Sequence, residues 1–205
     1  MGTAERKAKE KEELKDIILQ GARKLFVERG IEHTTIRNIA DAINYSVGTV
    51  YVYFKDKDTI LHELHTIGFL QLGGEMRVLF SVSDPMERLK ALGRVYIAFA
   101  ITNPDMYDLM FTLKAPMHFL EDKEKEEWNE GKATFEVLKT TVGQCMENGY
   151  FSGHELEALS FSIWSTVHGM CSLYISNRIK ACICGDPGTI LINAYEAYVK
   201  LVEKK

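Results

Sequence analysis

Apolar residues recur every three or four positions along most of the chain, and helix-breaking residues are sparse, with 4 prolines and 15 glycines among 205 residues. Apolar residues at this spacing share one side of an α-helix, whereas a half-buried strand would alternate at every second residue. No stretch alternates in that way for long, and no internal repeat is visible. The sequence therefore predicts an all-α fold.

Composition and charge limit the kind of protein that this can be. Hydrophobic residues make up 46% of the chain and charged residues 26%, as in ordinary folded domains. No apolar run approaches the about 18 residues that a membrane span requires, and the charged N-terminus is unlike a secretory signal. We therefore expect a cytoplasmic protein with no membrane contact.

The first two predicted helices are recognised by their boundaries and inward faces. The first helix is predicted to end before Gly30, because glycine commonly follows the last turn of a helix. Its inward face would consist of Leu14, Ile17, Ile18, Gly21, Leu25 and Phe26. Either Thr34 or Thr35 can cap a second, short helix. The inward residues of that helix would be Ile36, Ile39, Ala40 and Ile43.

A tight turn over residues 44–46 is predicted to join the second helix to a third. Ser46 is a suitable N-cap for the third helix, and Asp56 is a suitable N-cap for a fourth helix that follows directly. Val50 and Phe54 would point inward from the third helix. The sequence therefore predicts two short amphipathic helices joined by a tight turn, the geometry that lets a second helix enter the major groove of DNA.

Glycine and proline mark the later boundaries. Gly73 and Gly74 interrupt the fourth helical pattern, and Pro85 and Pro104 each follow an Asp or Asn that can serve as an N-cap. The stretch Leu113–Leu120 has no clear period and is predicted to be a loop. Later helices are expected over residues 121–147, 153–183 and 187–203. The middle one of these would begin with a capping box formed by residues 152 and 155.

The outward side of the third helix carries the candidate DNA contacts. Small residues at its start would let the backbone approach base edges, and hydroxyl and ammonium groups beside it could hold phosphates. The candidate contacts are Thr35, Arg37, Val47, Gly48, Thr49, Tyr51, Val52, Tyr53 and Lys57. The alternative is that this short aromatic helix only packs in a core. The net charge of −4 does not by itself favour nucleic acid.

The run GIEHTTIRNIADAINYSVGTVYVYFKDK, residues 30–57, resembles the signature of the TetR regulator family. The resemblance implies that the third helix is the recognition helix, that Tyr51 and Lys57 hold phosphates, and that residues 37, 47–49 and 53 face bases. The turn departs from the family pattern of a glycine followed by a small aliphatic residue. We expect Asn44 to adopt the left-handed conformation in place of glycine, and Tyr45 to bury its ring.

Two C-terminal helices are apolar over wide arcs, which predicts burial on more than one side. On the first of them a second stripe, Phe161, Trp164, His168, Cys171 and Ile175, runs beside the predicted interface stripe. The predicted interface residues are Leu156, Leu159, Ile163, Val167, Met170, Tyr174, Ile190, Ala194, Tyr198 and Leu201. In a homodimer these helices would form a four-helix interface, and the double-stranded DNA operator would be near-palindromic. A monomeric core is the alternative explanation for these stripes.

Bulky apolar residues between positions 85 and 180 could line a pocket for a small-molecule effector. The candidates are Tyr96, Phe99, Met106, Met110, Phe111, Met117, His118, Phe135, Trp164 and His168. The run YIAFAITNPDMYDLMF, residues 96–111, and the spacing of Trp164 from His168-Gly169 resemble one subgroup of TetR C-terminal domains. Any single one of these residues could equally be ordinary core.

No motif for catalysis, cofactor binding or metal binding is present, so we expect neither an enzyme nor a cofactor or metal site. His62 and His65 lack the HExxH spacing and are predicted to be surface residues. The four cysteines include no CxxC pair, and they are expected to be reduced thiols. We therefore expect a repressor with a DNA-binding domain over residues 1–57 and an effector and dimerisation domain over 58–205. The alternative is a thiol or small-molecule sensor that does not contact DNA.

Overall fold

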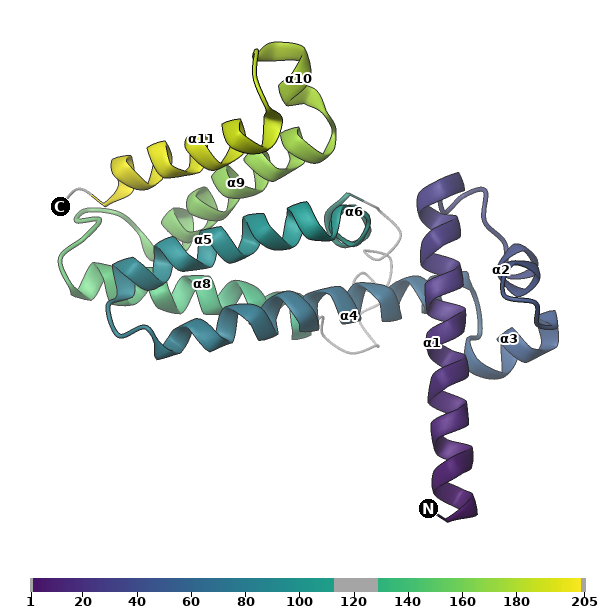
Figure 1. The fold of residues 1–205 in the computed structure, drawn as a ribbon. Helices are drawn as coiled ribbons and strands as arrows, with labels where there is room; N and C mark the ends of the chain where they lie inside the picture. The colour runs from purple at the N-terminus through teal and green to yellow at the C-terminus, as the bar shows by residue number, and fades with distance from the viewer. Residues whose placement is uncertain (1, 113–128, 204–205) are drawn as a thin grey trace. The chain divides into compact units, whose positions relative to one another are not determined.

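A computed structural model describes residues 2–112 and 129–203 of the chain (Figure 1). The described residues form helices and no strands, so the predicted all-α class is confirmed. The elements are α1 (Thr3–Arg29), α2 (Ile36–Ala42), α3 (Val47–Tyr53), α4 (Lys57–Arg77), the 3₁₀ turn η1 (Val78–Ser81), α5 (Pro85–Thr102), α6 (Pro104–Phe111), α8 (Asn129–Glu147), α9 (Leu156–Ile175), α10 (Arg178–Cys182) and α11 (Pro187–Val202). Within the described ranges, no helix is both long and apolar enough to cross a membrane.

The chain packs as two compact units. One unit is Met1–Ile67 with Asp108–Glu126, and the other is Gly68–Tyr107 with Glu127–Lys205. Helices α4 and α6 each contribute residues to both units. This division follows packing and not function, so the boundary expected after residue 57 stays a prediction.

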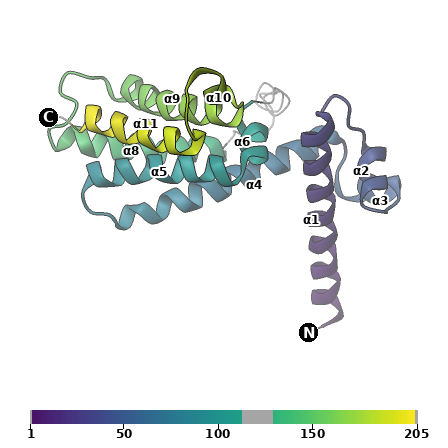
Figure 2. The ribbon, with the colours of Figure 1, turned by 45° about the horizontal axis from the view of Figure 1, so that its top comes forward.

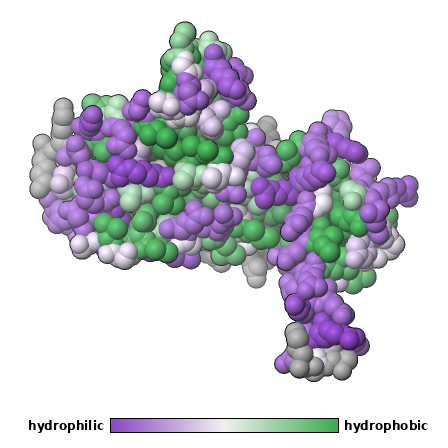
Figure 3. All heavy atoms as spheres, in the orientation of Figure 1, coloured by the Kyte–Doolittle hydropathy of each residue, from purple (hydrophilic) through white to green (hydrophobic). Residues whose placement is uncertain are grey.

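The first unit is built on one face of α1. Ile18, Leu25 and Phe26 are buried there as predicted, together with Val50 and Phe54 from the segment of α3. Ile17, which the sequence placed on the same face, is exposed, because the buried arc of α1 is narrower than its apolar arc. The first turns of α1 carry a hydrophilic surface (Figure 3).

The second unit is a bundle in which α5, α8, α9 and α11 lie side by side (Figures 1 and 2). One part of its core gathers Met86, Leu89, Val142, Cys145 and Ile163 from three of these helices. The predicted starts of α5 and α11 are confirmed, since each begins with proline directly after an aspartate N-cap. Each aspartate accepts a hydrogen bond from a backbone N–H of the first turn, which otherwise has no partner within the helix.

Two boundaries differ from the prediction. Helix α4 continues through Gly73 and Gly74, and a Cβ at Gly73 would lie 2.9 Å from the Thr134 hydroxyl of α8. Glycine here permits close helix packing and does not end the helix. The expected helix over 153–183 is instead α9 followed by α10, separated where Asn177 takes a positive φ of 55°. The loop expected over 113–120 and residues 121–128 of the expected long helix lie outside the described residues.

The capping box expected at the start of α9 is also absent. Glu155 is itself the N-cap, and its carboxylate accepts hydrogen bonds from the backbone N–H groups of Glu157 and Ala158. Ser152 therefore does not cap this helix. The two hydrogen bonds lower the pKa of the Glu155 carboxyl, because they stabilise its charged form.

Candidate nucleic-acid interface and candidate effector site

Helices α2 and α3 are joined by the tight turn that the sequence predicts. Asn44 has a φ of 59°, which confirms the left-handed conformation expected of it. The Tyr45 N–H then donates to the Ala40 carbonyl at 3.0 Å, closing the end of α2. Ser46 caps α3 by accepting a hydrogen bond from the Thr49 N–H at 3.0 Å. Local hydrogen bonds therefore define where α3 begins and how its face is turned.

The outward face of α3 is open to solvent. Tyr51 is 54% exposed and Val52 is 75% exposed, whereas Val50 of the same helix is fully buried. Gly48 is also exposed, and Val47, Thr49 and Tyr53 are half-buried. Among the residues that the sequence assigned to this face, Gly48, Tyr51 and Val52 are therefore the most open to solvent.

Tyr45 is a correction to the sequence analysis. Its ring was expected to be buried, but it is 42% exposed. Tyr45 directly follows the left-handed Asn44 and precedes the N-cap of α3, so its exposed ring lies in the turn between the two helices. The family pattern has a small residue at position 45. The tyrosine found there instead is the sequence signal for a further candidate DNA contact.

The predicted phosphate-contact residues at the two ends of this segment already have partners. The Lys57 ammonium donates to the Ile31 carbonyl at 2.6 Å, which holds the start of α4 against the loop after α1. The Thr35 hydroxyl donates to the Asn38 side-chain oxygen at 2.8 Å while capping α2. Arg37 is exposed. A lysine ammonium has three protons, so Lys57 keeps donors for an anion while bound to Ile31.

Four aromatic residues of the second unit form a hydrogen-bonded cluster, which we call the aromatic network: Tyr96, Tyr107, Trp164 and His168. Trp164 Nε1 donates to the Tyr96 hydroxyl at 3.2 Å. The hydroxyls of Tyr96 and Tyr107 lie 2.9 and 2.6 Å from Nδ1 of His168. Tyr96, Trp164 and His168 were predicted pocket residues, whereas Tyr107 was not among them although it lies within residues 96–111.

Burial sets the ionisation of the aromatic network. Desolvation lowers the pKa of His168 below its ordinary value, and it raises the pKa of the Tyr96 hydroxyl. The imidazole and the phenol are therefore both uncharged at neutral pH. The polar atoms of the network are therefore neutral hydrogen-bonding groups.

The other predicted pocket residues fall into three groups. Phe135 contacts the Trp164 ring, with centroids 5.9 Å apart, and so adjoins the aromatic network. Phe99, Met106 and Met110 are buried, and Phe111 is half-buried. The candidates Met117 and His118 lie outside the described residues.

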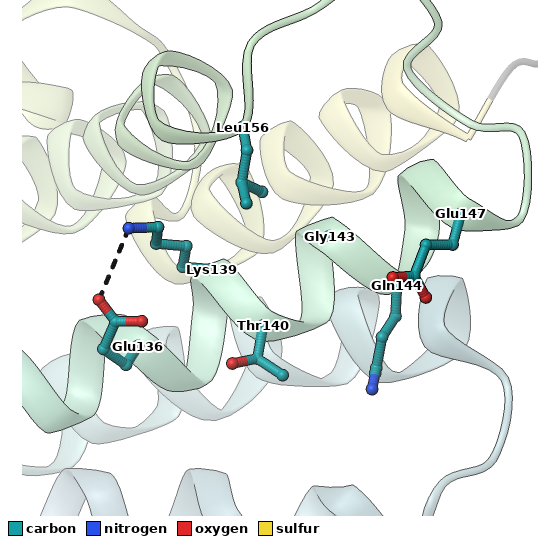
Figure 4. Close-up of a pocket in the computed structure, with 7 residues that line it drawn as sticks. All are labelled: Glu136, Lys139, Thr140, Gly143, Gln144, Glu147 and Leu156. Atoms are coloured by element: carbon teal, nitrogen blue, oxygen red, sulfur yellow. Dashed lines mark ion pairs between the residues drawn. The ribbon is translucent and has the colours of Figure 1, made fainter.

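A shallow polar depression lies elsewhere, on the outer side of α8 (Figure 4). Six of its lining residues come from α8 and one is Leu156 of α9. In it Lys139 pairs with Glu136 of the same helix at 3.7 Å. None of the predicted effector residues lines this depression.

The predicted interface stripes are placed differently on the two helices. On α9, Ile163 and Val167 are buried inside the protomer, and Leu156 and Leu159 pack against the core around Met86. The protomer's own core therefore accounts for these four residues. Met170 and Tyr174 are half-buried.

On α11 the predicted stripe faces outward. Ala194 and Leu201 are exposed, the latter at 70%, while Ile190 and Tyr198 are half-buried. On α9 the exposed side instead carries a mixture of small and large residues, Ser162 and Ser165 beside Phe161 and Leu173. The stripes differ because α5 and α8 cover one side of α9, and the sequence did not reveal which of its two apolar sides they would cover.

The remaining candidate residues are two histidines and four cysteines. His65 was predicted to be a surface residue, but it is only 4% exposed, whereas His62 is half-buried. Cys145 and Cys171 are buried free thiols, and Cys182 and Cys184 are exposed free thiols. Among the residues that the structure describes, no three His, Cys, Asp or Glu side chains gather in a way that could hold a metal ion.

Two family models match the chain. The model for bacterial regulatory proteins of the tetR family matches residues 18–64, and the model for the tetracyclin repressor-like C-terminal domain matches residues 89–187. The first match covers α2 and α3, and the second covers the aromatic network. The run of residues 30–57 thus lies within the first match, and the run of residues 96–111 lies within the second.

Curated relatives match the chain over a part of their length. The HTH-type transcriptional repressor KstR2 of Mycolicibacterium smegmatis is 34% identical over 80 residues, which cover 38% of this chain and 38% of that protein. The HTH-type transcriptional regulator HbdR of Aromatoleum sp. strain CIB is 48% identical over 50 residues, or 24% of this chain and 22% of that protein. The matches thus span well under half of the relatives.

Solved structures match nearly the whole fold. The fatty acid degradation regulator FadR of Bacillus halodurans has a TM-score of 0.71 at 19% identity, covering 89% of this chain and 92% of that one. FadR of Bacillus subtilis, solved in complex with stearoyl-CoA, has a TM-score of 0.71 at 17% identity, covering 91% and 97%. At these identities the likeness concerns the fold.

Proposed function

The chain belongs to the TetR family of bacterial regulatory proteins, and we propose that it is a ligand-responsive transcriptional repressor acting on DNA in the cytoplasm. The observation that carries the proposal is the open outward face of α3, fixed by the left-handed Asn44 and the Ser46 cap. A short capped helix with small residues at its start and hydroxyls along one side suits entry into a major groove.

We assign the DNA contacts to two groups. Gly48 and Thr49 would approach base edges at the start of α3, with Arg37, Val47, Val52 and Tyr53 beside them. Tyr51, Lys57 and Thr35 would hold phosphates and set the register without reading sequence. The exposure of Tyr51 and the spare protons of Lys57 support this assignment.

The repressor is proposed to be a homodimer. The stripe of Ile190, Ala194 and Leu201 on α11 would meet its twofold-related copy. The apolar stripe would thereby lose contact with water. A twofold dimer places two copies of α3 roughly 34–36 Å apart or a multiple of it, which calls for a near-palindromic operator.

Helix α6 is proposed to couple the effector to DNA binding. Tyr107 in α6 bonds His168, and three residues later the Met110 backbone bonds His65 of α4. A ligand that displaces Tyr107 would therefore disturb α6. The next turn of α6 contacts α4, which is the helix that follows α3. Coupling of this kind requires that the ligand prefer one of two states of the dimer.

The effector is proposed to be a small apolar or aromatic molecule bound beside the aromatic network. Trp164, Phe135 and Tyr96 supply aromatic surface, and His168 and the tyrosine hydroxyls supply a few orienting polar groups. The stearoyl-CoA bound to FadR of Bacillus subtilis makes a long acyl chain the competing ligand class.

Selection of bound duplexes from a random DNA library tests the function. The full chain should enrich a single near-palindromic sequence whose half-sites are one or two helical turns apart. Enrichment of an isolated half-site would contradict the dimer, and recovery of unselected sequence would contradict the regulator. Sedimentation of Leu201→Glu, with Ile192→Glu as a control lying off the stripe, would show whether α11 forms the interface.

A further inference from the structure

The aromatic network continues outward as a chain of aromatic rings. His168 and Trp164 lie 5.7 Å apart between centroids, and Trp164 lies 6.1 Å from Phe161. Exposure falls along this chain, from 58% at Phe161 to 1% at Tyr107. The aromatic surface therefore leads from solvent to a buried polar end within one unit of the fold.

The polar end has two hydroxyls at one ring nitrogen. The oxygens of Tyr96 and Tyr107 both lie within hydrogen-bond distance of His168 Nδ1, although an imidazole nitrogen makes one in-plane hydrogen bond. Tyr107 also reaches the His168 carbonyl at 3.2 Å, which gives it a second acceptor. A ligand group could therefore take one position at Nδ1 while both tyrosines keep a partner.

The polar atoms that meet in the network are uncharged. Indole N–H, phenol and imidazole groups, with the imidazole kept neutral by burial, match a neutral hydroxyl or carbonyl. A carboxylate in the same place would exchange hydration for neutral partners, which costs more than burying a neutral group. Tyr107 stacks on one face of the His168 ring, with centroids 5.3 Å apart, so a ligand ring would lie against Trp164 and the other side of His168. Such ring surfaces favour a flat unsaturated ligand over a saturated one of the same size.

We propose that the aromatic network is the effector site and that its ligand is a flat aromatic ring compound bearing an uncharged hydroxyl or carbonyl group. The ring would lie against Trp164 and His168, and the polar group would bond His168 Nδ1 or the Tyr96 hydroxyl. The proposal rests on the proposed function, because it names the ligand class of that regulator. It restricts the effector to one chemical class and excludes acyl chains and carboxylic acids.

Titration calorimetry of the full chain, without DNA, tests the ligand class with matched probes. 2-Naphthol is the flat neutral probe, 2-decalol is its saturated counterpart, and 2-naphthoate is its charged counterpart. We expect 2-naphthol to bind at least about tenfold more tightly than either counterpart. Equal or tighter binding of 2-decalol or 2-naphthoate, or no saturable binding of 2-naphthol, would overturn the proposal. Binding of stearoyl-CoA in place of 2-naphthol would assign the site to acyl chains.

Variants test the site itself. Tyr96→Phe and His168→Gln should each weaken 2-naphthol binding about tenfold or more. Tyr195→Phe is the matched control, because this buried tyrosine bonds the Lys90 carbonyl, away from the network. Unchanged binding in both network variants, with their folding verified by urea titration, would overturn the site. DNA binding is measured separately, so failure of the ligand class and failure of the regulator are distinguishable.

Discussion

His65 of α4 hydrogen-bonds the backbone of Met110 in α6, from a position where the imidazole is almost completely buried. Burial is the largest cause that lowers the pKa of His65 to about 4. The folded protein therefore holds this ring neutral at pH 5, where an unfolded chain would protonate it.

The His65 pKa predicts a loss of stability in mild acid. Since the unfolded chain binds more protons than the folded chain between pH 6.5 and 4, the free energy of unfolding falls as the pH is lowered through this window. The loss from His65 should be about 3 kcal/mol. Urea midpoints of the wild type and of His65→Gln, which cannot titrate, should differ in pH dependence over this window. Parallel curves would show that His65 is not held neutral.

Substitutions of two glycines in helix interiors distinguish the effect of side-chain packing from the effect of helix propensity. A Cβ at Gly93 of α5 would overlap the Tyr195 ring of α11, whereas a Cβ at Gly74 of α4 would meet nothing within 4 Å. Gly93→Ala should destabilise the fold by about 1–3 kcal/mol, and Gly74→Ala should stabilise it by about 0.5–1 kcal/mol. Thermal melts measure both, and a stable Gly93→Ala variant would mean that α5 and α11 are less closely packed.

Thiol reactivity distinguishes the repressor from a thiol sensor. Burial raises the pKa of Cys145 to about 11 and that of Cys171 to about 12, so neither supplies a thiolate at neutral pH. We expect Ellman's reagent to titrate only the exposed Cys182 and Cys184 in the folded chain, and all four thiols in urea. DNA binding should survive this modification. Loss of binding on modification, with no effect from changes to α3, would favour the thiol sensor.

The phosphate contacts predict a specific change in salt dependence. Lys57→Ala should weaken operator binding and reduce the slope of log affinity against log salt by about 1. Tyr51→Phe should weaken binding by about 1 kcal/mol, because a single neutral hydrogen bond is removed. Lys24→Ala is the control, since it removes an equal charge from an exposed site on α1. Wild-type affinity in both α3-region variants would contradict the assignment.

Local chemistry made the helix boundaries predictable. The caps at Thr35, Ser46 and Asp84, and the left-handed Asn44, depend on residues within a few positions of one another. Such interactions are visible in sequence because the partners are neighbours along the chain.

What the sequence did not reveal depends on distant partners. Tyr107 becomes part of the aromatic network only because α6 lies beside His168 of α9. In the sequence Gly73 predicts a helix end, whereas in the structure it leaves room for Thr134 of α8. The 42% exposure of the Tyr45 ring likewise could not be predicted from the hydrophobicity of tyrosine.

Whether the chain binds an operator can be measured by fluorescence anisotropy of labelled DNA from immediately upstream of the coding region, titrated with the full chain at two salt concentrations. We expect saturable binding that resists unrelated competitor DNA and falls steeply with salt. Weak binding, equal for the upstream DNA and for unrelated DNA at both salt concentrations, would contradict the proposal that the chain represses from that site.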